Sequence, residues 1–440
     1  MNSYISDIDK NTLRIAIPLI LANITIPLVG FVDNVAMGQL GSAIYIGAVG
    51  LGAIIISFIL FSFGFIKSIT ASFTSQHTGE NKRKTLLISL YQILIISSSI
   101  SLAIILFREQ IIHMALSYMG GSAEVKANTK IYLDYRIWSV PAIFLRDILI
   151  GYYIGIQKTR IAMIISIFIN ILNALLDYYF IFILHFGIEG VAIASIISEY
   201  SIFLFIIFAI KTEELISKNN ISLNTIFYWN TFKKKIFINF DMFVRSFILM
   251  TCFAYFMSMG AQYGNLILAA NTILLNFFFI FSYGIDGFAH ASEVLVANYF
   301  GEKNLKLIKK SIISTGKLSF ILMILYLVFF LIFDQRIIGF ITTIESVQII
   351  AIDNSIWLYL IFLSATIAFW LDGVFIGILK IKLLRNTMII AAIIFFVLET
   401  MIIGGNNSGL WLSFLGFFIV RSFLLGLYLI KYMRKDRFLV

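Results

Sequence analysis

Twelve long apolar runs divide the sequence, and they constrain its fold more than any other feature. Each has about 20 residues or more, the length that a helix needs to cross the roughly 30 Å hydrocarbon core of a bilayer. Hydrophobic residues make up 60% of the 440 residues and charged residues 13%, whereas soluble domains carry about 25% charged residues. We therefore predict an all-α polytopic membrane protein. The expected spans are 13–37, 43–67, 86–107, 131–157, 160–184, 188–210, 236–262, 265–299, 312–333, 350–380, 386–403 and 409–431.

The first apolar run does not have the pattern of a cleaved signal peptide. Its leader contains Asp7 and Asp9, no small-residue cleavage site follows it, and Pro18 and Pro27 interrupt it. Because proline removes a backbone hydrogen bond from a helix, we expect this run to remain as a first helix that is kinked at Pro27.

Basic residues are distributed unequally between the loops. If the N-terminus is cytoplasmic, the cytoplasmic segments hold 23 Lys and Arg residues and the external loops hold 4. Positively charged loops stay in the cytoplasm, so both termini are expected there, in a multi-pass protein of the cell (inner) membrane. The net charge of +10 then belongs to the loops, and nucleic acid is not expected as a partner.

The two halves of the chain resemble each other. Residues 154–158 match residues 376–380 at an offset of 222, and residues 61–64 match residues 281–284 at an offset of 220. We predict two six-helix bundles related by a pseudo-two-fold axis along the membrane normal, as in parallel-repeat transporters. The expected parts are an N-terminal lobe over 1–210, a cytoplasmic linker over 211–235 and a C-terminal lobe over 236–440.

Polar residues inside the spans of the N-terminal half gather at one predicted depth. Asn173 and Asp177 are four residues apart in the fifth span, and Asp33 and Ser195 lie near the outer ends of the first and sixth spans. An ionised residue at the bilayer centre costs at least about 2.5–3.5 kcal/mol, which makes a functional role more plausible than packing alone. Two neighbouring carboxylates raise the pKa of one of them, so the group suits a proton or a sodium ion. Helix-packing hydrogen bonds are the alternative interpretation.

A second polar stripe lies in the C-terminal half. Residues with 7-3-4-3 spacing share one face of the eighth span, and Asp372 lies beside Gly373 in the tenth span. We interpret these residues as lining a substrate cleft; an intrahelical network around a core histidine is the alternative. The stripe consists of Asn276, Tyr283, Asp286, His290 and Glu293.

Other charged residues in the spans suggest structural pairs. Asp241 and Arg245 have the spacing of an ion pair on one helix. Arg421 needs a partner or access to water, and Glu399 is one candidate.

Enzyme signatures are not found in the sequence. No HExxH, P-loop, GxSxG or GxGxxG pattern occurs, and the four histidines have no metal-ligand spacing. With one cysteine, no Cys-rich metal site is expected either. We therefore predict no enzyme activity, no cofactor and no metal beyond a sodium ion at the coupling residues.

Several stretches are similar to a known transporter family. The segment Pro27–Gly41 resembles the first helix and following loop of multidrug and toxic compound extrusion (MATE) transporters. Ala270–Glu293, Leu371–Gly377 and Asn173–Asp177 are similar to its bacterial subfamily named for DNA-damage-inducible protein F. The resemblance covers nearly the whole chain and implies a twelve-helix, two-lobe cation-coupled antiporter.

The resemblance also implies roles for particular residues. Asp33 matches the first-helix aspartate that is central to cation coupling, and Asn173, Asp177 and Ser195 match a nearby cation site, with Ser195 in place of threonine. Arg146 departs from the family pattern, in which asparagine is expected. Its cationic side chain would weaken sodium binding or hold Asp147 as an ion pair, so the coupling ion stays open between proton and sodium.

The expected function is export of amphipathic or cationic organic compounds by alternating access, driven by inward movement of protons or sodium. The expected partners are small organic substrates and the lipid bilayer, and the protein is expected to be a monomer. A flippase for lipid-linked precursors is an alternative within the larger superfamily, for which Arg136 and Arg146 are the candidate cations. A membrane-embedded enzyme is the alternative from a different class.

Overall fold

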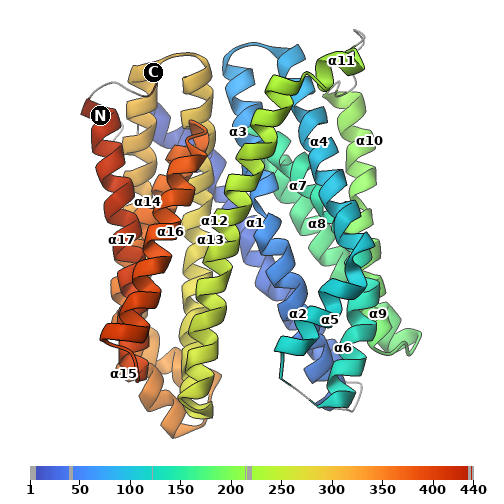
Figure 1. The fold of residues 1–440 in the computed structure, drawn as a ribbon, viewed down its shortest axis with the longest axis vertical. Coiled ribbons are helices and arrows are strands. Elements are labelled where there is room, and N and C mark those ends of the chain that lie inside the picture. The colour runs from blue at the N-terminus through green and yellow to red at the C-terminus, as the bar shows by residue number, and fades with distance from the viewer. Residues whose placement is uncertain are drawn as a thin grey trace. The chain divides into compact units, whose positions relative to one another are not determined.

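The computed structural model consists almost entirely of helices (Figure 1). It describes residues 6–38, 43–120, 122–213, 215, 221–434 and 438, except for the side chains of 26–38, 43, 44, 46 and 118. No β-strand occurs in these residues, which confirms the all-α prediction. The α-helices are α1 (Asp7–Gly38), α2 (Ala43–Phe63), α3 (Phe65–Gly79), α4 (Arg83–Leu106), α5 (Arg108–Tyr118), α6 (Ala123–Arg136), α7 (Val140–Gly155), α8 (Thr159–Tyr178), α9 (Ile188–Tyr200), α10 (Ile202–Thr212), α11 (Leu223–Ile226), α12 (Trp229–Gln262), α13 (Asn265–Gly301), α14 (Leu305–Ile341), α15 (Glu345–Gly377), α16 (Ile381–Val397) and α17 (Asn407–Arg434).

Eleven helical segments of the described chain are long and apolar enough to cross a membrane. They are 47–79, 83–106, 123–155, 159–183, 188–212, 229–262, 265–301, 305–341, 345–377, 381–402 and 407–434. These segments confirm the second to twelfth predicted spans. The first predicted span, 13–37, coincides with α1, whose 32 residues extend over about 48 Å. A bend at Pro27 stays a prediction, because the side chains of this part of α1 are not described.

The second span is longer than hydropathy predicted. The expected end was residue 67, but α3 continues to Gly79. Its last three turns are rich in small polar residues, and Thr70, Ser72, Thr74 and Ser75 are all buried. α3 packs against α7 and α4, so these hydroxyl groups lie inside the protein. Lys67 consequently lies twelve residues inside the helix end.

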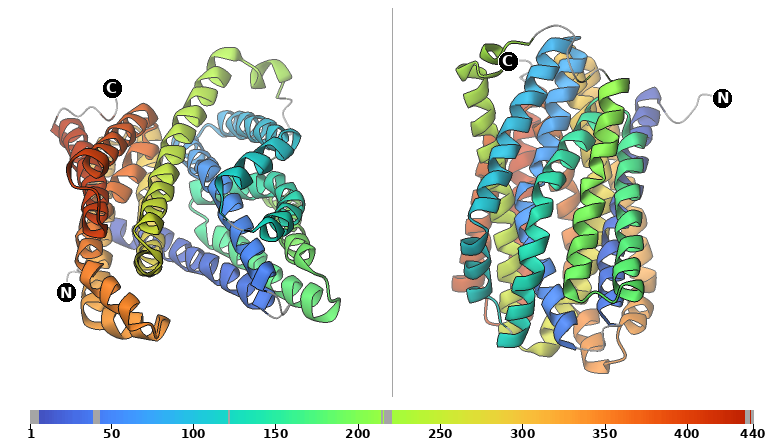
Figure 2. Two further views of the ribbon diagram at one scale, coloured as in Figure 1. Left: turned by 60° about the horizontal axis from the view of Figure 1, so that its bottom comes forward. Right: turned by 90° about the vertical axis from the view of Figure 1, so that its right-hand side faces the viewer.

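The chain divides into two compact units. One consists of Leu21–Asn239, and the other of Met1–Ile20 together with Phe240–Val440. Within each unit the long helices run alongside one another (Figures 1 and 2). The predicted lobes, 1–210 and 236–440, assign Met1–Ile20 and the linker differently, and they stay a prediction, as does the pseudo-two-fold axis.

Hydrogen bonds explain why the start of α1 belongs with the C-terminal helices. Asp9 accepts hydrogen bonds from the hydroxyl of Ser314 at 2.5 Å and from the ammonium group of Lys317 at 2.7 Å. The hydroxyls of Thr12 and Ser314 are 3.1 Å apart. Lys317 therefore holds the beginning of α1 against α14.

Matching helix crossings reveal the internal repeat in the structure. A Cβ atom at Gly155 of α7 would lie 2.7 Å from the carbonyl oxygen of Ala71 in α3. A Cβ atom at Gly377 of α15 would lie 2.7 Å from the carbonyl oxygen of Glu293 in α13. The two pairs are related by the offset of 222 that the sequence shows. Each unit therefore contains the same close crossing, which only glycine permits.

Left-handed turns recur with the same spacing. Asn81 and Lys303 have positive φ angles of 55° and 56°, and Gln157 and Leu379 have φ angles of 62° and 54°. Both pairs again have the sequence offset of 222. Non-glycine residues adopt this backbone conformation only rarely, so the agreement indicates a repeated fold and confirms the repeat seen in the sequence.

Aromatic side chains fill the core of the unit that contains α12–α17. Phe256, Phe278, Phe362 and Phe414 are all less than 2% exposed. The rings of Phe256 and Phe414 are 4.9 Å apart, and those of Phe278 and Phe418 are 5.5 Å apart. Many phenylalanine side chains therefore pack between helices inside the protein, in addition to those that face outward.

Candidate functional site

Helices α8 and α9 bring three of the four predicted coupling residues into one buried region of the unit that contains Leu21–Asn239. The side-chain amide of Asn173 in α8 donates to the hydroxyl of Ser195 in α9 at 3.3 Å. Asp177 lies one turn beyond Asn173 on the same face of α8 and is fully buried. Asn173 and Ser195 are 4% and 5% exposed. The predicted Asn173–Asp177–Ser195 group is therefore brought together by the fold.

A second contact attaches α8 to α1. The amide of Asn170 donates to the hydroxyl of Thr25 at 2.5 Å. Asp33 follows Thr25 by eight residues along α1, and Asp177 follows Asn170 by seven residues along α8. These separations correspond to about 12 Å and about 10.5 Å of helix rise. The predicted topology gives the first and fifth spans the same direction, so similar heights of residues 33 and 177 stay a prediction; the side chain of Asp33 lies outside the described residues.

Arg146 of α7 forms an ion pair with a carboxylate that the sequence analysis missed. Its guanidinium contacts Glu199 of α9 at 2.5 Å and Asp147 at 3.3 Å. Glu199 is one turn beyond Ser195, so this ion pair adjoins the Asn173–Ser195 contact. Two carboxylates against one guanidinium leave the group with a formal charge of −1. Arg146 is therefore compensated locally, and the expected ion pair with Asp147 is confirmed.

The buried oxygen atoms of this region have the chemistry of a cation site. Oxygen ligands suit small hard cations, and a carboxyl group can instead take a proton. The amide oxygen Oδ1 of Asn173 accepts no hydrogen bond from the described residues. Asp177 supplies a buried carboxyl group one turn away. A cation or a proton would compensate charge that is otherwise costly inside a membrane span.

Two residues of the polar stripe of α13, His290 and Glu293, contact each other. His290 Nδ1 lies 3.1 Å from Glu293 Oε2, and Glu293 is 1% exposed. Asp286 and Tyr283 are half-buried, whereas Asn276 is exposed. The His290–Glu293 contact matches the alternative of an intrahelical network. The role of the stripe in substrate binding stays a prediction.

Asp372 of α15 is held by two arginines. The guanidinium groups of Arg245 in α12 and Arg421 in α17 both donate to its Oδ2 atom. Arg421 is fully buried and Asp372 is 5% exposed. One carboxylate against two guanidinium groups leaves a formal charge of +1. This environment disfavours a direct role of Asp372 in attracting cationic substrates, because the neighbouring arginines would repel them.

The predicted ion pair of Asp241 with Arg245 is wrong, and the candidate partner Glu399 does not pair with Arg421. Asp241 pairs with Arg385 of α16, and not with Arg245 on its own helix. Arg421 pairs with Asp372, and not with Glu399, which instead accepts a hydrogen bond from Tyr263 at 2.9 Å. Helix packing determines which residues on different helices form ion pairs. The spacing of residues along one helix does not reveal these partners.

Metal-ligating side chains do not cluster in the part of the chain that the structure describes. There, no group of three or more His, Cys, Asp or Glu residues is arranged to hold a metal ion. The group at Asn173, Asp177 and Ser195 has one carboxylate and two neutral oxygen donors, a set that fits a monovalent cation or a proton more readily than a transition metal.

Comparison with known proteins shows the family. The model of the MatE family matches residues 18–179 and 242–401, two stretches whose last residues are 222 apart and whose first residues are 224 apart. DNA damage-inducible protein F of Escherichia coli K12 is 30% identical over 96% of this chain and 92% of its own length. The multidrug resistance protein NorM of Vibrio vulnificus CMCP6 is 27% identical over 67% of this chain and 65% of its own.

Solved structures share the fold. The chain matches the outward-facing structure of a multidrug resistance MATE family transporter of the MOP superfamily with a TM-score of 0.84 and 18% identity, over 98% of this chain and 97% of that one. These relatives are transporters and not enzymes. With its repeated helix crossings, the eleven membrane-spanning segments of its described part and these matches, the chain belongs to the MatE family of membrane transporters.

Proposed function

We propose that this transporter exports small organic compounds by alternating access and uses the inward movement of a cation as its energy source. The observation that carries the proposal is the buried contact between Asn173 and Ser195, with Asp177 one turn away. A hydrogen bond between an amide and a hydroxyl group would be enough to hold α8 against α9. A fully buried carboxyl group beside them is better explained by a site that takes up and releases a cation.

The charge distribution supports a cation and not an anion at this site. Glu199 and Asp147 exceed Arg146 by one negative charge, and the group lies one turn from Ser195. Proton and sodium ion both fit the oxygen donors. The resemblance of Asp33 to the family's coupling aspartate adds a second carboxyl group at a similar predicted height along α1.

The proposed substrates are amphipathic or cationic organic compounds. Multidrug resistance is named for several relatives, and Asp286 is a half-buried carboxyl group in α13. The group of Arg245, Asp372 and Arg421 has a formal charge of +1 and would attract anions. Any panel of test substrates must therefore include anionic compounds. The flippase alternative has lost one of its two candidate cations, because Arg146 is compensated by two carboxylates. Arg136 donates to the neutral hydroxyl of Ser139 and keeps its charge.

The remaining features of the proposal follow from the sequence. We place both termini and the 211–235 linker in the cytoplasm, with 1–210 and 236–440 as the two lobes of a monomer in the inner membrane. The excess of basic residues in the cytoplasmic segments supports this orientation. Neither nucleic acid nor a resident cofactor has a part in the mechanism.

Transport by purified protein in proteoliposomes tests the proposal. Fluorescent cationic, neutral and anionic compounds are offered while an inward proton or sodium gradient is imposed. Export that depends on one of these gradients would support cation coupling. A transport rate that stays the same with and without each gradient would contradict cation coupling.

A further inference from the structure

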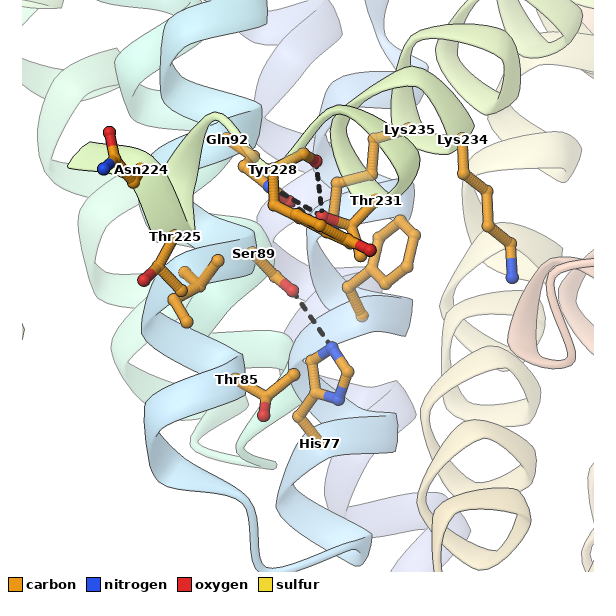
Figure 3. Close-up of a pocket in the computed structure, with 12 residues that line it drawn as sticks. His77, Thr85, Ser89, Gln92, Asn224, Thr225, Tyr228, Thr231, Lys234 and Lys235 are labelled. Carbon is orange, nitrogen blue, oxygen red and sulfur yellow. Dashed lines mark hydrogen bonds between the residues drawn. The ribbon is translucent and has the colours of Figure 1, made fainter. Parts of the chain in front are cut away.

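A pocket of about 480 Å³ lies at one end of the unit that contains Leu21–Asn239, far along the chain from the coupling residues. Helices α3, α4, α11 and the beginning of α12 surround it, so the short helix α11 of the linker forms part of its wall. Figure 3 shows His77, Ser89 and Tyr228 around a common space, with Lys234 at its edge. A volume of this size lies in the range of small-molecule sites.

Lys235 gives the pocket a buried positive charge. Its side chain is 7% exposed, and its ammonium group donates to Gln92 Oε1 at 2.7 Å and lies 4.8 Å from the centre of the Phe73 ring. Among the described residues no carboxylate forms an ion pair with it. An ammonium group has three donors, so hydrogen-bonding capacity remains after the bond to Gln92.

The lining of the pocket as a whole also has an excess of positive charge. The 12 lining residues include two lysines but neither aspartate nor glutamate. Hydroxyl groups of serine, threonine and tyrosine supply further donors, and Phe73 and Ile88 supply apolar surface. Burial of a cation without an opposite charge is unfavourable, and an anionic group in the pocket would provide that charge.

The position of the pocket suits the headgroup region of a bilayer. α3 ends at Gly79 and α4 begins at Arg83, so the pocket lies near the predicted cytoplasmic ends of these two helices. Beside it, Phe227, Tyr228 and Trp229 are 51%, 57% and 61% exposed. Exposed aromatic residues are enriched at membrane interfaces, and neighbouring lysines attract anionic lipids.

The linker is held in place by the same residues. Gln92 is fully buried, and its amide donates to the carbonyl oxygen of Ile226 at 2.7 Å and to the hydroxyl of Thr231 at 3.3 Å. The amide oxygen Oε1 of Gln92 accepts the hydrogen bond from Lys235. A ligand that binds Lys235 would therefore stabilise α11 and the start of α12 against α4.

We propose that this pocket binds the phosphate group of an anionic glycerophospholipid from the surrounding leaflet. The phosphate would lie against Lys235, with Lys234 and the hydroxyl groups as further contacts. The glycerol and first acyl carbons would contact Phe73, Ile88 and the exposed aromatic residues. The inference is independent of the coupling ion and of the exported substrate.

Lipid titration of the full-length protein in detergent, followed by native mass spectrometry, tests this proposal. The probes are phosphatidylglycerol, zwitterionic phosphatidylcholine and soluble glycerol 3-phosphate. Lys235→Gln should weaken phosphatidylglycerol binding by about fivefold or more, since a lysine near anionic lipid contributes about 1 kcal/mol. The control Lys233→Gln removes the same charge from an exposed residue outside the pocket. Because salt screens exposed charges that do not contact the bound phosphate, this variant should weaken binding by less than about twofold.

A second variant covers the case in which Lys235→Gln fails to fold. Ile88→Trp fills the pocket from α4 without changing its charge and should weaken phosphatidylglycerol binding to a similar extent. Equal effects of the two lysine variants, equal binding of both lipids, or unchanged binding to Ile88→Trp would overturn the proposal. Displacement of the lipid by millimolar glycerol 3-phosphate would assign the pocket to a soluble phosphate compound and would overturn the lipid as its occupant.

Discussion

Several charged side chains inside the helices of this transporter form ion pairs with residues on other helices. Arg146 contacts Glu199, Arg421 contacts Asp372, and Arg385 contacts Asp241. Such pairing follows from the cost of an uncompensated charge in a membrane span. Asp177, in its buried group with Asn173 and Ser195, is the carboxyl group to which our proposal assigns the coupling role.

The first residue-scale prediction concerns Asp33. Asp33→Asn keeps the shape of a protonated carboxyl group but removes its titration. The variant should fold, insert and bind substrate within about tenfold of the unmodified protein, which is about 1.4 kcal/mol, and should not export against a gradient. Binding and gradient-driven transport are measured on the same purified sample. Export at the unmodified rate would move the coupling role to Asp177 or Asp286.

The second prediction separates substrate attraction from packing. Asp286→Asn should reduce export of cationic compounds more than export of neutral ones, because a carboxylate attracts cations strongly in a low-dielectric environment. Asp372→Asn would not separate these two roles, because the carboxylate of Asp372 forms ion pairs with two arginines. Equal losses for cationic and neutral compounds would mean that Asp286 acts in coupling or packing.

Individual site residues could be predicted from the sequence, but their partners could not. Asp177 and Asp372 stand out because ionisable residues are rare in apolar runs. One partner of Asp372, Arg245, is 127 residues away along the chain, and only the fold brings the two side chains together. Glu199 could have been found from its place one turn beyond Ser195 in an apolar span.

At the scale of helices, hydropathy located the eleven spans of the described chain but misjudged where some of them end. α3 extends twelve residues past its expected end because its polar residues face neighbouring helices and not lipid. A hydropathy pattern averages over both faces of a helix and cannot distinguish these environments. The short helix α11 inside the predicted linker was missed for a related reason: it is held by the buried side chain of Gln92.

The crossing of α13 and α15 provides a prediction at this scale. A Cβ atom at Gly373 would overlap the carbonyl oxygen of Ala289. Gly373→Ala should therefore lower the stability of the protein by about 1–3 kcal/mol, the usual cost of overpacking a core. The readout is the midpoint of thermal unfolding in detergent.

Gly426→Ala is the matched control for Gly373→Ala. Gly426 lies in α17 with open space around its Cβ position, and alanine favours a helix over glycine by up to about 1 kcal/mol. This variant should unfold at the same or a higher temperature. A Gly373→Ala protein as stable as the control would show that the crossing is looser than the structure indicates.

For the whole molecule, the repeat was the most reliable sequence signal. The offset of 222 recurs in the glycine crossings, in the left-handed turns and in the last residues of the two stretches matched by the MatE family model. The assignment of Met1–Ile20 to the C-terminal helices was not visible in the repeat, because it depends on the contacts of Asp9 with Ser314 and Lys317.

Membrane orientation is the fourth prediction. Single cysteines placed at Lys218 and at Ser122 should be labelled from opposite faces of the membrane, because the basic residues favour a cytoplasmic linker. The native Cys252 is fully buried and should not react. Labelling of both introduced cysteines from the same face would refute the topology and the alignment of residues 33 and 177.

The most direct test of cation-coupled export is transport by the unmodified protein in proteoliposomes under one imposed gradient at a time. We predict that a fluorescent cation accumulates against its own gradient when protons or sodium ions flow in the opposite direction. Collapsing that ion gradient should stop accumulation, and Asp177→Asn should do the same. Accumulation that persists after both gradients are collapsed, or transport that only dissipates the substrate gradient, would contradict cation-coupled export.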